Sequence, residues 1–276
     1  MVKTSGERGI NIACPHRLTC LGAHPSASKN RMNHVEVLCA VQAAYCAEDY
    51  AATIAQTERD LFRIGLISPR AGLTLCDVGS GVGAFGPTCA ALGMCVTVLD
   101  DFRDPNNIRL GEAAFLAHHK FGVRILRADA NREFPVAGSF DVMTCFASIE
   151  HHHNSPKQML HSMVEHLKPG GLFVLSAPNS VDLMKRFQTI VGSAQWSPIE
   201  EWYESAEFRG HVREPRLADL HYIARDLGLR DYEIVGRTFI WRKDGLLKSA
   251  MRLIARLIQP WPSLNSELFL VAYKSA

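Results

Sequence analysis

Short apolar runs alternate along this chain with segments in which apolar residues recur at helical spacing. Runs typical of buried strands lie at 73–78, 95–99, 123–126, 140–146, 172–176, 232–237 and 267–273. Helical periodicity is found at 34–65, 84–92, 108–120, 156–167 and 216–227. Short apolar strands that alternate with amphipathic helices are typical of a parallel sheet covered on both faces. We therefore predict an α/β fold.

Two segments fall outside this alternation. Residues 1–33 are polar, and we expect an N-terminal extension there, with disorder as one alternative. Its candidate metal ligands, Cys14, His16, Cys20 and His24, match no zinc spacing, so we predict no metal site. Residues 34–276 are expected to form one domain that begins with helices at 34–65 and contains an insertion at 179–214.

The composition limits which partners the protein can bind and in which cellular compartment we expect it. The 276 residues include 30 Lys and Arg against 28 Asp and Glu, a net charge of +2 that does not favour nucleic acid. The first ten residues lack the apolar core of a secretory signal, and the 8 cysteines follow no disulfide framework. We expect a reduced, cytoplasmic protein in which Cys76 and Cys145 pack as core thiols.

A glycine-rich turn follows the first strand. It reads Gly79-Ser80-Gly81-Val82-Gly83 and precedes a helix. Because glycine has no Cβ, it lets the backbone turn sharply and approach a ligand closely. The first turn of the helix that follows presents unpaired N–H groups. Gly79-x-Gly81-x-x-Ala84 with Asp100 about 20 residues later also meets the relaxed dinucleotide fingerprint, which leaves a nicotinamide dehydrogenase as an alternative.

Several motifs in order and spacing resemble the class I S-adenosylmethionine (SAM)-dependent methyltransferases. The matching residues are Asp77, Gly79, Ser80, Gly81 and Gly83, then Asp100 with its neighbour Asp101, Asp129 with Ala130, Phe146 to Glu150, and the turn 167–171. The resemblance implies a Rossmann-like, seven-stranded, mostly parallel sheet whose last strand, 267–273, is antiparallel. It implies SAM as cofactor, with the glycine turn at the methionine part, Asp100 or Asp101 at the ribose, Asp129 and Ala130 at the adenine, and Phe146 in the SAM and acceptor pocket. A non-catalytic SAM-binding protein stays a further alternative.

The stretch Glu150-His151-His152-His153 follows the fourth strand, at the edge of the sheet where ligands bind. A hydroxyl acceptor needs a general base, and we predict His151 or His152 for that role, with Glu150 contacting the acceptor. A purely structural role for these histidines is the alternative. Quinone-biosynthetic O-methyltransferases resemble this stretch but place acidic metal ligands here. Because imidazole suits Mg²⁺ poorly, we assign no metal.

The insertion is our candidate for acceptor specificity. The aromatic residues Trp196, Trp202 and Tyr203 suit stacking on a ring, and His211 and Arg213 suit a polar or anionic group. The segment resembles bacterial methyltransferases of glycan assembly. We therefore predict O-methylation of a small molecule or glycan, with a quinone-like or phenolic acceptor as the alternative.

A final helix is predicted at 246–258. Lys248, Arg252 and Arg256 form a basic stripe beside apolar positions, and Trp261 follows. Such a helix can lie on an anionic membrane surface, whereas packing on the sheet is the alternative.

Overall fold

The computed structural model describes residues 25–45, 54–104, 108, 111–193, 197–240 and 246–275. The histidines and cysteines at 14–24 and Trp196 lie outside these residues. Among the described residues, no helix combines the length and the apolar character that a membrane crossing requires.

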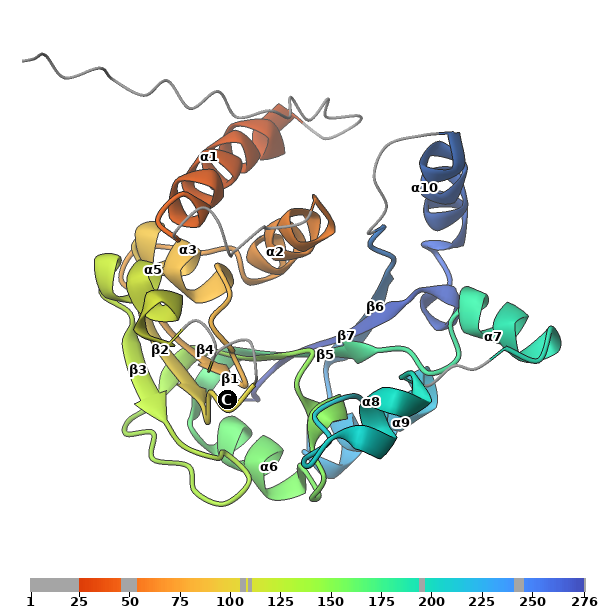
Figure 1. Ribbon diagram of the computed structural model, residues 1–276. Coiled ribbons are helices and arrows are strands. Elements are labelled where there is room, and N and C mark those ends of the chain that lie inside the picture. Colours follow the sequence, from red (N-terminus) through yellow and green to blue (C-terminus); the bar gives the residue numbers. More distant parts are fainter. Residues whose placement is uncertain are drawn as a thin grey trace, which may run out of the picture.

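A single seven-stranded sheet with the order β3-β2-β1-β4-β5-β7-β6 forms the centre of the molecule (Figure 1). The strands are β1 (Thr74–Val78), β2 (Cys95–Asp100), β3 (Arg124–Arg127), β4 (Phe140–Phe146), β5 (Leu167–Pro178), β6 (Tyr232–Arg237) and β7 (Glu267–Tyr273). β1 to β5 pair in parallel, whereas β7 runs antiparallel to both β5 and β6. The predicted mostly parallel sheet with an antiparallel last strand is confirmed.

Helices cover both faces of this sheet, as predicted (Figure 1). The helices are α1 (Pro25–Gln42), α2 (Ile54–Ile67), α3 (Phe85–Ala91), α5 (Leu116–Lys120), α6 (Lys157–Glu165), α7 (Leu183–Ile190), α8 (Ile199–Glu204), α9 (Leu217–Asp226) and α10 (Leu246–Ile258). Residues of α2 and α3 pack with the strands on one face, and residues of α6 and α9 pack on the other. Cys76 and Cys145 are fully buried in the hydrophobic core, as expected for core thiols.

Most element boundaries differ from the prediction by one or two residues, and three elements differ by more. α1 begins at Pro25, within the expected extension. Within the helix predicted over 108–120, residues 111–120 form the 3₁₀ turn η1 (Gly111–Phe115) followed by α5. β5 begins at Leu167, which pairs with Phe140 of β4, and it includes the Gly170–Gly171 turn. The Gly170 backbone donates to the Lys274 carbonyl, and the Lys274 backbone donates to the Gly171 carbonyl.

Candidate functional site

At the glycine turn after β1, the backbone passes close to the side chain of Ser148. Gly79 and Gly81 have φ of +65° and +54°, a left-handed conformation that favours glycine. A Cβ on Gly79 would lie 2.0 Å from the Ser148 hydroxyl oxygen. Only glycine therefore allows the turn after β1 to meet the segment after β4.

Asp100 closes this turn from the end of β2. Its carboxylate accepts backbone hydrogen bonds from Gly81 at 2.9 Å and from Phe102 at 2.6 Å. Burial raises the pKa of Asp100, and these two hydrogen bonds oppose that rise. Asp101 instead accepts from the Arg103 backbone and lies 3.4 Å from the Arg209 guanidinium. The two candidate ribose acids thus face different partners, and Asp100 is the one joined to the glycine turn.

Asp77 lies beneath the turn, almost wholly buried in β1. Burial raises its pKa to about 7, although a hydrogen bond from the Thr144 hydroxyl at 2.7 Å favours the ionised form. Two further residues of the turn make hydrogen bonds, one within the turn and one to Tyr45. Ser80 donates to the Gly81 carbonyl, and the Gly83 carbonyl accepts from the Tyr45 hydroxyl at 3.0 Å.

Asp129 and Ala130 follow β3 at the same edge of the sheet. The Asp129 carboxylate accepts from the Asn131 backbone at 3.0 Å and pairs with Arg132. The Asn131 side-chain nitrogen lies 2.7 Å from Nδ1 of His152, whose Nε2 lies 3.4 Å from the Ser148 hydroxyl. His152 therefore joins the predicted adenine segment to the glycine turn, and both of its ring nitrogens are engaged.

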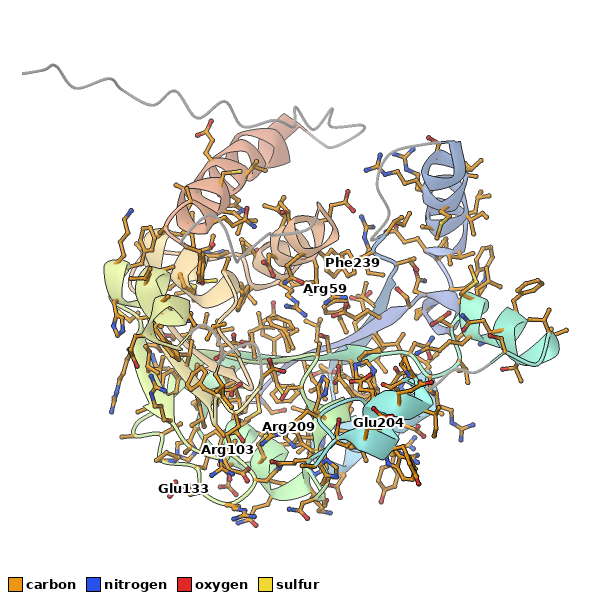
Figure 2. The ribbon with its side chains drawn as sticks, viewed as in Figure 1. Arg59, Arg103, Glu133, Glu204, Arg209 and Phe239 are labelled. Atoms are coloured by element: carbon orange, nitrogen blue, oxygen red, sulfur yellow. The ribbon has the colours of Figure 1, made fainter. Side chains whose placement is uncertain are left out.

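Phe146 ends β4 with its ring packed in the core. The ring meets Phe85 edge-on at 5.0 Å, and the Arg63 guanidinium lies 4.7 Å from its centroid. Arg63 also lies 3.4 Å from the buried Glu267 carboxylate. Nearby, Arg59 stacks on Phe239 beneath α2 (Figure 2). The Phe146 ring thus forms part of a charged and aromatic wall rather than projecting freely into a pocket.

Glu150 lies in the 3₁₀ turn η2 (Ile149–His151) that follows β4. Its side chain is 0% exposed, and within the described residues no other group donates a hydrogen bond to either carboxylate oxygen. Burial raises its pKa to about 7. Ala147, three residues before Glu150, has a φ of +48°, a conformation that costs about 1–2 kcal/mol outside glycine. Unpaired buried carboxylates and strained strand ends of this kind are concentrated at functional sites.

Two imidazoles face Glu150. The Nδ1–H of His151 donates to the Arg209 carbonyl at 2.8 Å, which leaves Nε2 4.0 Å from the Glu150 carboxylate. The ring of His211 meets that of His151 edge-on at 4.8 Å. Burial lowers the pKa of His151, which therefore favours the neutral ring. His153 is exposed and bonds the Phe208 carbonyl, so it stands apart from this group.

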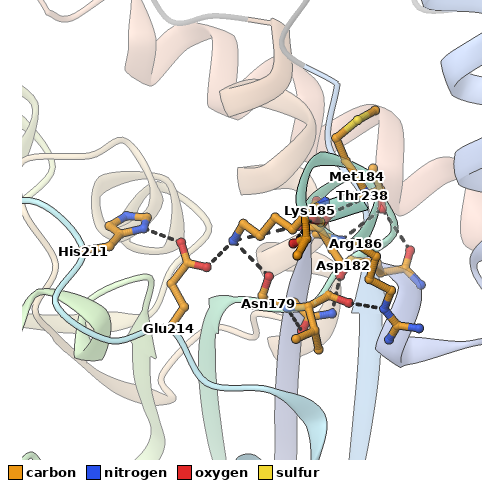
Figure 3. A network of polar contacts seen from close by, with 12 residues as sticks. Asn179, Asp182, Met184, Lys185, Arg186, His211, Glu214 and Thr238 are labelled. Carbon is orange, nitrogen blue, oxygen red and sulfur yellow. Dashed lines mark hydrogen bonds and ion pairs between the residues drawn. The ribbon is translucent and has the colours of Figure 1, made fainter. Parts of the chain in front are cut away.

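A polar network extends from His211 into the insertion (Figure 3). His211 donates to Glu214 at 2.6 Å, and this bond raises the pKa of His211. Burial alone would raise the pKa of Glu214, but hydrogen bonds from His211 and Lys185 outweigh burial and lower it. Lys185 of α7 pairs with Glu214 and donates to the Asn179 carbonyl at 2.9 Å. These residues tie α7 to the site.

A cavity of about 310 Å³ lies beside this network. It is lined by Ser180, Lys185, Ser197, His211, Arg213, Glu214, Arg216 and Asp219. The Arg213 side chain is mainly exposed and lies 3.7 Å from Asp219. Trp202 and Tyr203, in contrast, are exposed on α8, and neither lines this cavity.

The group Glu150, His151 and His211 can do two things chemically. Their candidate ligand atoms lie within 4.8 Å of one another, so the group could hold a divalent cation. Two imidazoles and one carboxylate suit Zn²⁺ or Fe²⁺ better than Mg²⁺. Without a cation, a carboxylate with a pKa of about 7 can accept a proton near neutral pH.

Sequence reasoning assigned no individual role to three residues that order the site. Glu214 and Lys185 order His211, and Ser148 fills the space opened by Gly79. The spacing of His211 and Glu214 was a usable signal, because residues three apart can pair. Nothing in the sequence could place Lys185 beside Glu214.

Comparison with known proteins agrees with the glycine-turn motifs. The model of the methyltransferase domain family matches residues 48–234. The ubiquinone biosynthesis O-methyltransferase of Pseudomonas paraeruginosa is 30% identical over 189 residues, which are 64% of this chain and 74% of that protein. The protein of the same name from Rickettsia prowazekii is 26% identical over 175 residues, 62% of this chain and 64% of the relative.

Solved structures show the same fold. Haemonchus contortus phosphoethanolamine N-methyltransferase 2, in complex with SAM, matches with a TM-score of 0.55 and 16% identity over 88% of this chain and 57% of that chain. The YcgJ protein of Bacillus subtilis matches with a TM-score of 0.52 and 16% identity over 79% of this chain and 99% of that chain. At these identities the likeness concerns the fold alone.

Proposed function

This chain belongs to the SAM-dependent methyltransferases of the matched domain family, and we propose that it transfers the methyl group of SAM to a hydroxyl of a small organic acceptor. The dehydrogenase alternative is set aside, because the matched family and the relatives are methyltransferases. The observation that supports the hydroxyl acceptor best is Glu150, buried without a hydrogen-bond donor and flanked by two imidazoles.

SAM supplies a methyl group already activated on a sulfonium. The residues that we propose to hold it lie at the ends of β1, β2 and β3 or just after them: Asp77, Gly79, Ser80, Gly81, Gly83, Asp100, Asp129 and Ala130. The turn after β1 touches Ser148, which precedes Glu150 by two residues, so the cofactor turn and the proposed acceptor site share one wall. Holding the acceptor in line with the methyl group can account for roughly 7–11 kcal/mol of the barrier.

We assign the role of general base, which accepts the proton of the acceptor hydroxyl, to Glu150 rather than to His152. Both ring nitrogens of His152 are engaged by Asn131 and Ser148. His151 keeps Nε2 available, so His151 and His211 can pass the proton onward from Glu150. The same three residues are the ones that would hold a divalent cation and bring an acceptor oxygen to it.

A phenolic acceptor fits this base better than a sugar. A phenol, like tyrosine, has a pKa near 10, roughly 3 units above that of Glu150 at about 7. A sugar hydroxyl is far less acidic, so proton transfer to the same carboxylate would be much less favourable. The names of the Pseudomonas and Rickettsia relatives also concern a quinone. The glycan acceptor stays as the second candidate, favoured by the exposed Trp202 and Tyr203 on α8.

The test is methyl transfer from labelled SAM to two sets of acceptors, substituted catechols and lipid-linked sugars, with and without a chelator. We expect turnover with catechols. Turnover with sugars alone would contradict the phenolic acceptor, and SAM binding without turnover on either set would indicate the non-catalytic alternative. Loss of turnover with chelator, restored by Zn²⁺ or Fe²⁺, would assign the Glu150 group to a cation.

A further inference from the structure

Exposed apolar side chains are concentrated on two helices at one end of the sheet. Of the 17 large apolar or aromatic side chains exposed among the described residues, 10 lie within 181–191 and 253–261. On most surfaces of soluble monomeric proteins, such side chains occur singly. Their concentration here therefore indicates a surface that contacts an apolar partner.

α7 presents one apolar face outward. Leu183, Met184, Phe187 and Ile190 recur at helical spacing, and all four are exposed. Phe187 is 59% exposed and Ile190 is 83% exposed, and α7 contains no buried residue. The first turn of the helix is capped, because the Asp182 side chain accepts hydrogen bonds from the backbone of Met184 and Lys185.

α10 shows a second such face. Leu253 and Leu257 are 59% and 61% exposed, and Trp261 continues the four-residue spacing with 58% exposure. The exposed face differs from the one that periodicity alone suggests, since Met251 and Ile258 are half-buried. Arg252 pairs with Glu58 of α2 and so holds α10 against the rest of the molecule.

The two helices belong to one region of the surface. The Arg186 guanidinium of α7 donates at 3.0 Å to the carbonyl of Ser263, in the 3₁₀ turn η3 (Pro262–Leu264) just after Trp261. Both helices lie at the end of the sheet formed by β7 and β6 (Figure 1).

The charges of this region indicate which kind of partner contacts the apolar faces of α7 and α10. Neither α7 nor α10 contains an acidic residue. Arg186 donates to two backbone carbonyls and Arg256 is exposed, so these two arginines supply positive charge, whereas Arg252 is paired with Glu58. A symmetric contact between two copies would place this cationic surface against itself, which is unfavourable. An apolar face flanked by arginines and followed by Trp fits an anionic lipid surface.

We propose that α7 and α10 together dock the protein on an anionic membrane surface. α7 links that surface to the proposed acceptor site, because its outer residues face solvent while Lys185 on its inner side joins Glu214 and His211. The docking surface is independent of the methyl transfer proposed above, but it would bring a lipid-borne acceptor to the cavity beside Lys185.

The test is sedimentation of the full chain with phosphatidylcholine vesicles that contain or lack phosphatidylglycerol, at low ionic strength. The variants are Phe187→Ser with Ile190→Ser, Leu253→Ser with Leu257→Ser, and Arg256→Gln. Tyr222→Ser is the matched control, since Tyr222 is 66% exposed on α9. Circular dichroism and SAM calorimetry establish that each variant is folded.

We expect binding to the anionic vesicles that falls at least about tenfold in each double variant and about fivefold in Arg256→Gln. The control should bind like the unaltered chain. The proposal would be overturned if the unaltered chain did not bind the vesicles, or if both double variants bound them as well as the unaltered chain does. A concentration-dependent dimer that the double variants lose, without vesicle binding, would assign the surface to a second copy instead.

Discussion

At the scale of single residues, the site depends on where carboxylates are buried. Glu150 and Asp77 both have a pKa raised to about 7 by burial, but only Asp77 accepts a side-chain hydrogen bond within the described residues. A buried carboxylate without donors keeps its capacity to accept a proton or to bind a cation, so Glu150 differs from Asp77 in function.

Replacement of Glu150 by Gln should lower turnover by roughly 100-fold or more, because the proton acceptor is removed. In the unaltered chain the rate should rise with pH up to about 7, as Glu150 ionises, and the variant should lose that rise. The measurement is a pH–rate profile together with SAM calorimetry. Glu204→Gln on exposed α8 is the control, and full turnover of Glu150→Gln would contradict the assignment.

Asp100→Asn should weaken SAM binding about tenfold, since one oxygen cannot replace the two that accept from Gly81 and Phe102. Asp101→Asn should have a smaller effect, because Asp101 bonds Arg103 and Arg209 rather than the glycine turn. Calorimetric titration with SAM distinguishes the two. A larger loss in the Asp101 variant would move the ribose contact to that residue.

At the scale of elements, the insertion is joined to the sheet by buried polar contacts more than by apolar ones. α7 and α8 contain no buried residue, yet Lys185 reaches Glu214, and the Glu150 carbonyl accepts backbone hydrogen bonds from Val212 and Arg213. The position of His211 beside Glu150 therefore depends on these polar contacts.

Lys185→Met should lower the free energy of unfolding by about 2 kcal/mol, because Glu214 stays partly buried without its amine partner. The KM of the acceptor should rise while the affinity for SAM stays unchanged. Urea denaturation and steady-state kinetics check both effects. Lys157→Met, which breaks an exposed pair with Asp226, is the matched control and should change neither.

At the scale of the whole molecule, buried carboxyls make stability depend on pH. The pKa values of Asp77 and Glu150 are raised above their unfolded values, so the folded state binds more protons between about pH 4 and 7. Their stabilising contribution is complete at low pH and is lost as pH rises through about 7. Burial lowers the pKa of His118 to about 4. The contribution of His118 to stability therefore changes with pH in the opposite direction, and does so at lower pH.

The free energy of unfolding should therefore fall by about 1–2 kcal/mol between pH 6.5 and 8, a window above the His118 effect. Urea denaturation at the two pH values measures this difference. Glu150→Gln should remove about half of the decline. A stability that rises across this window would show that the two carboxyls are ionised in the folded state.

Much of the fold was predictable because it depends on local patterns. The ranges 140–146, 232–237 and 267–273 match β4, β6 and β7 residue for residue, since apolar runs and turn residues delimit strands. Boundaries were less predictable where long-range pairing decides them, as in β5, which begins at Leu167 because that residue pairs with Phe140 of β4. The positions of Asp77 near the end of β1, Asp100 at the end of β2 and Asp129 after β3 also followed from the order of the strands.

The sequence by itself determined the order of strands and helices, the glycine turn and the class of cofactor, because periodicity and motif spacing are local properties of the chain. Only the tertiary structure decided that His211 returns to Glu150, that His152 turns toward Asn131, and that α7 and α10 leave apolar faces in solvent. The physical reason is burial. The pKa of a carboxylate and the exposure of an apolar side chain depend on segments distant in sequence, which come together only when the chain folds.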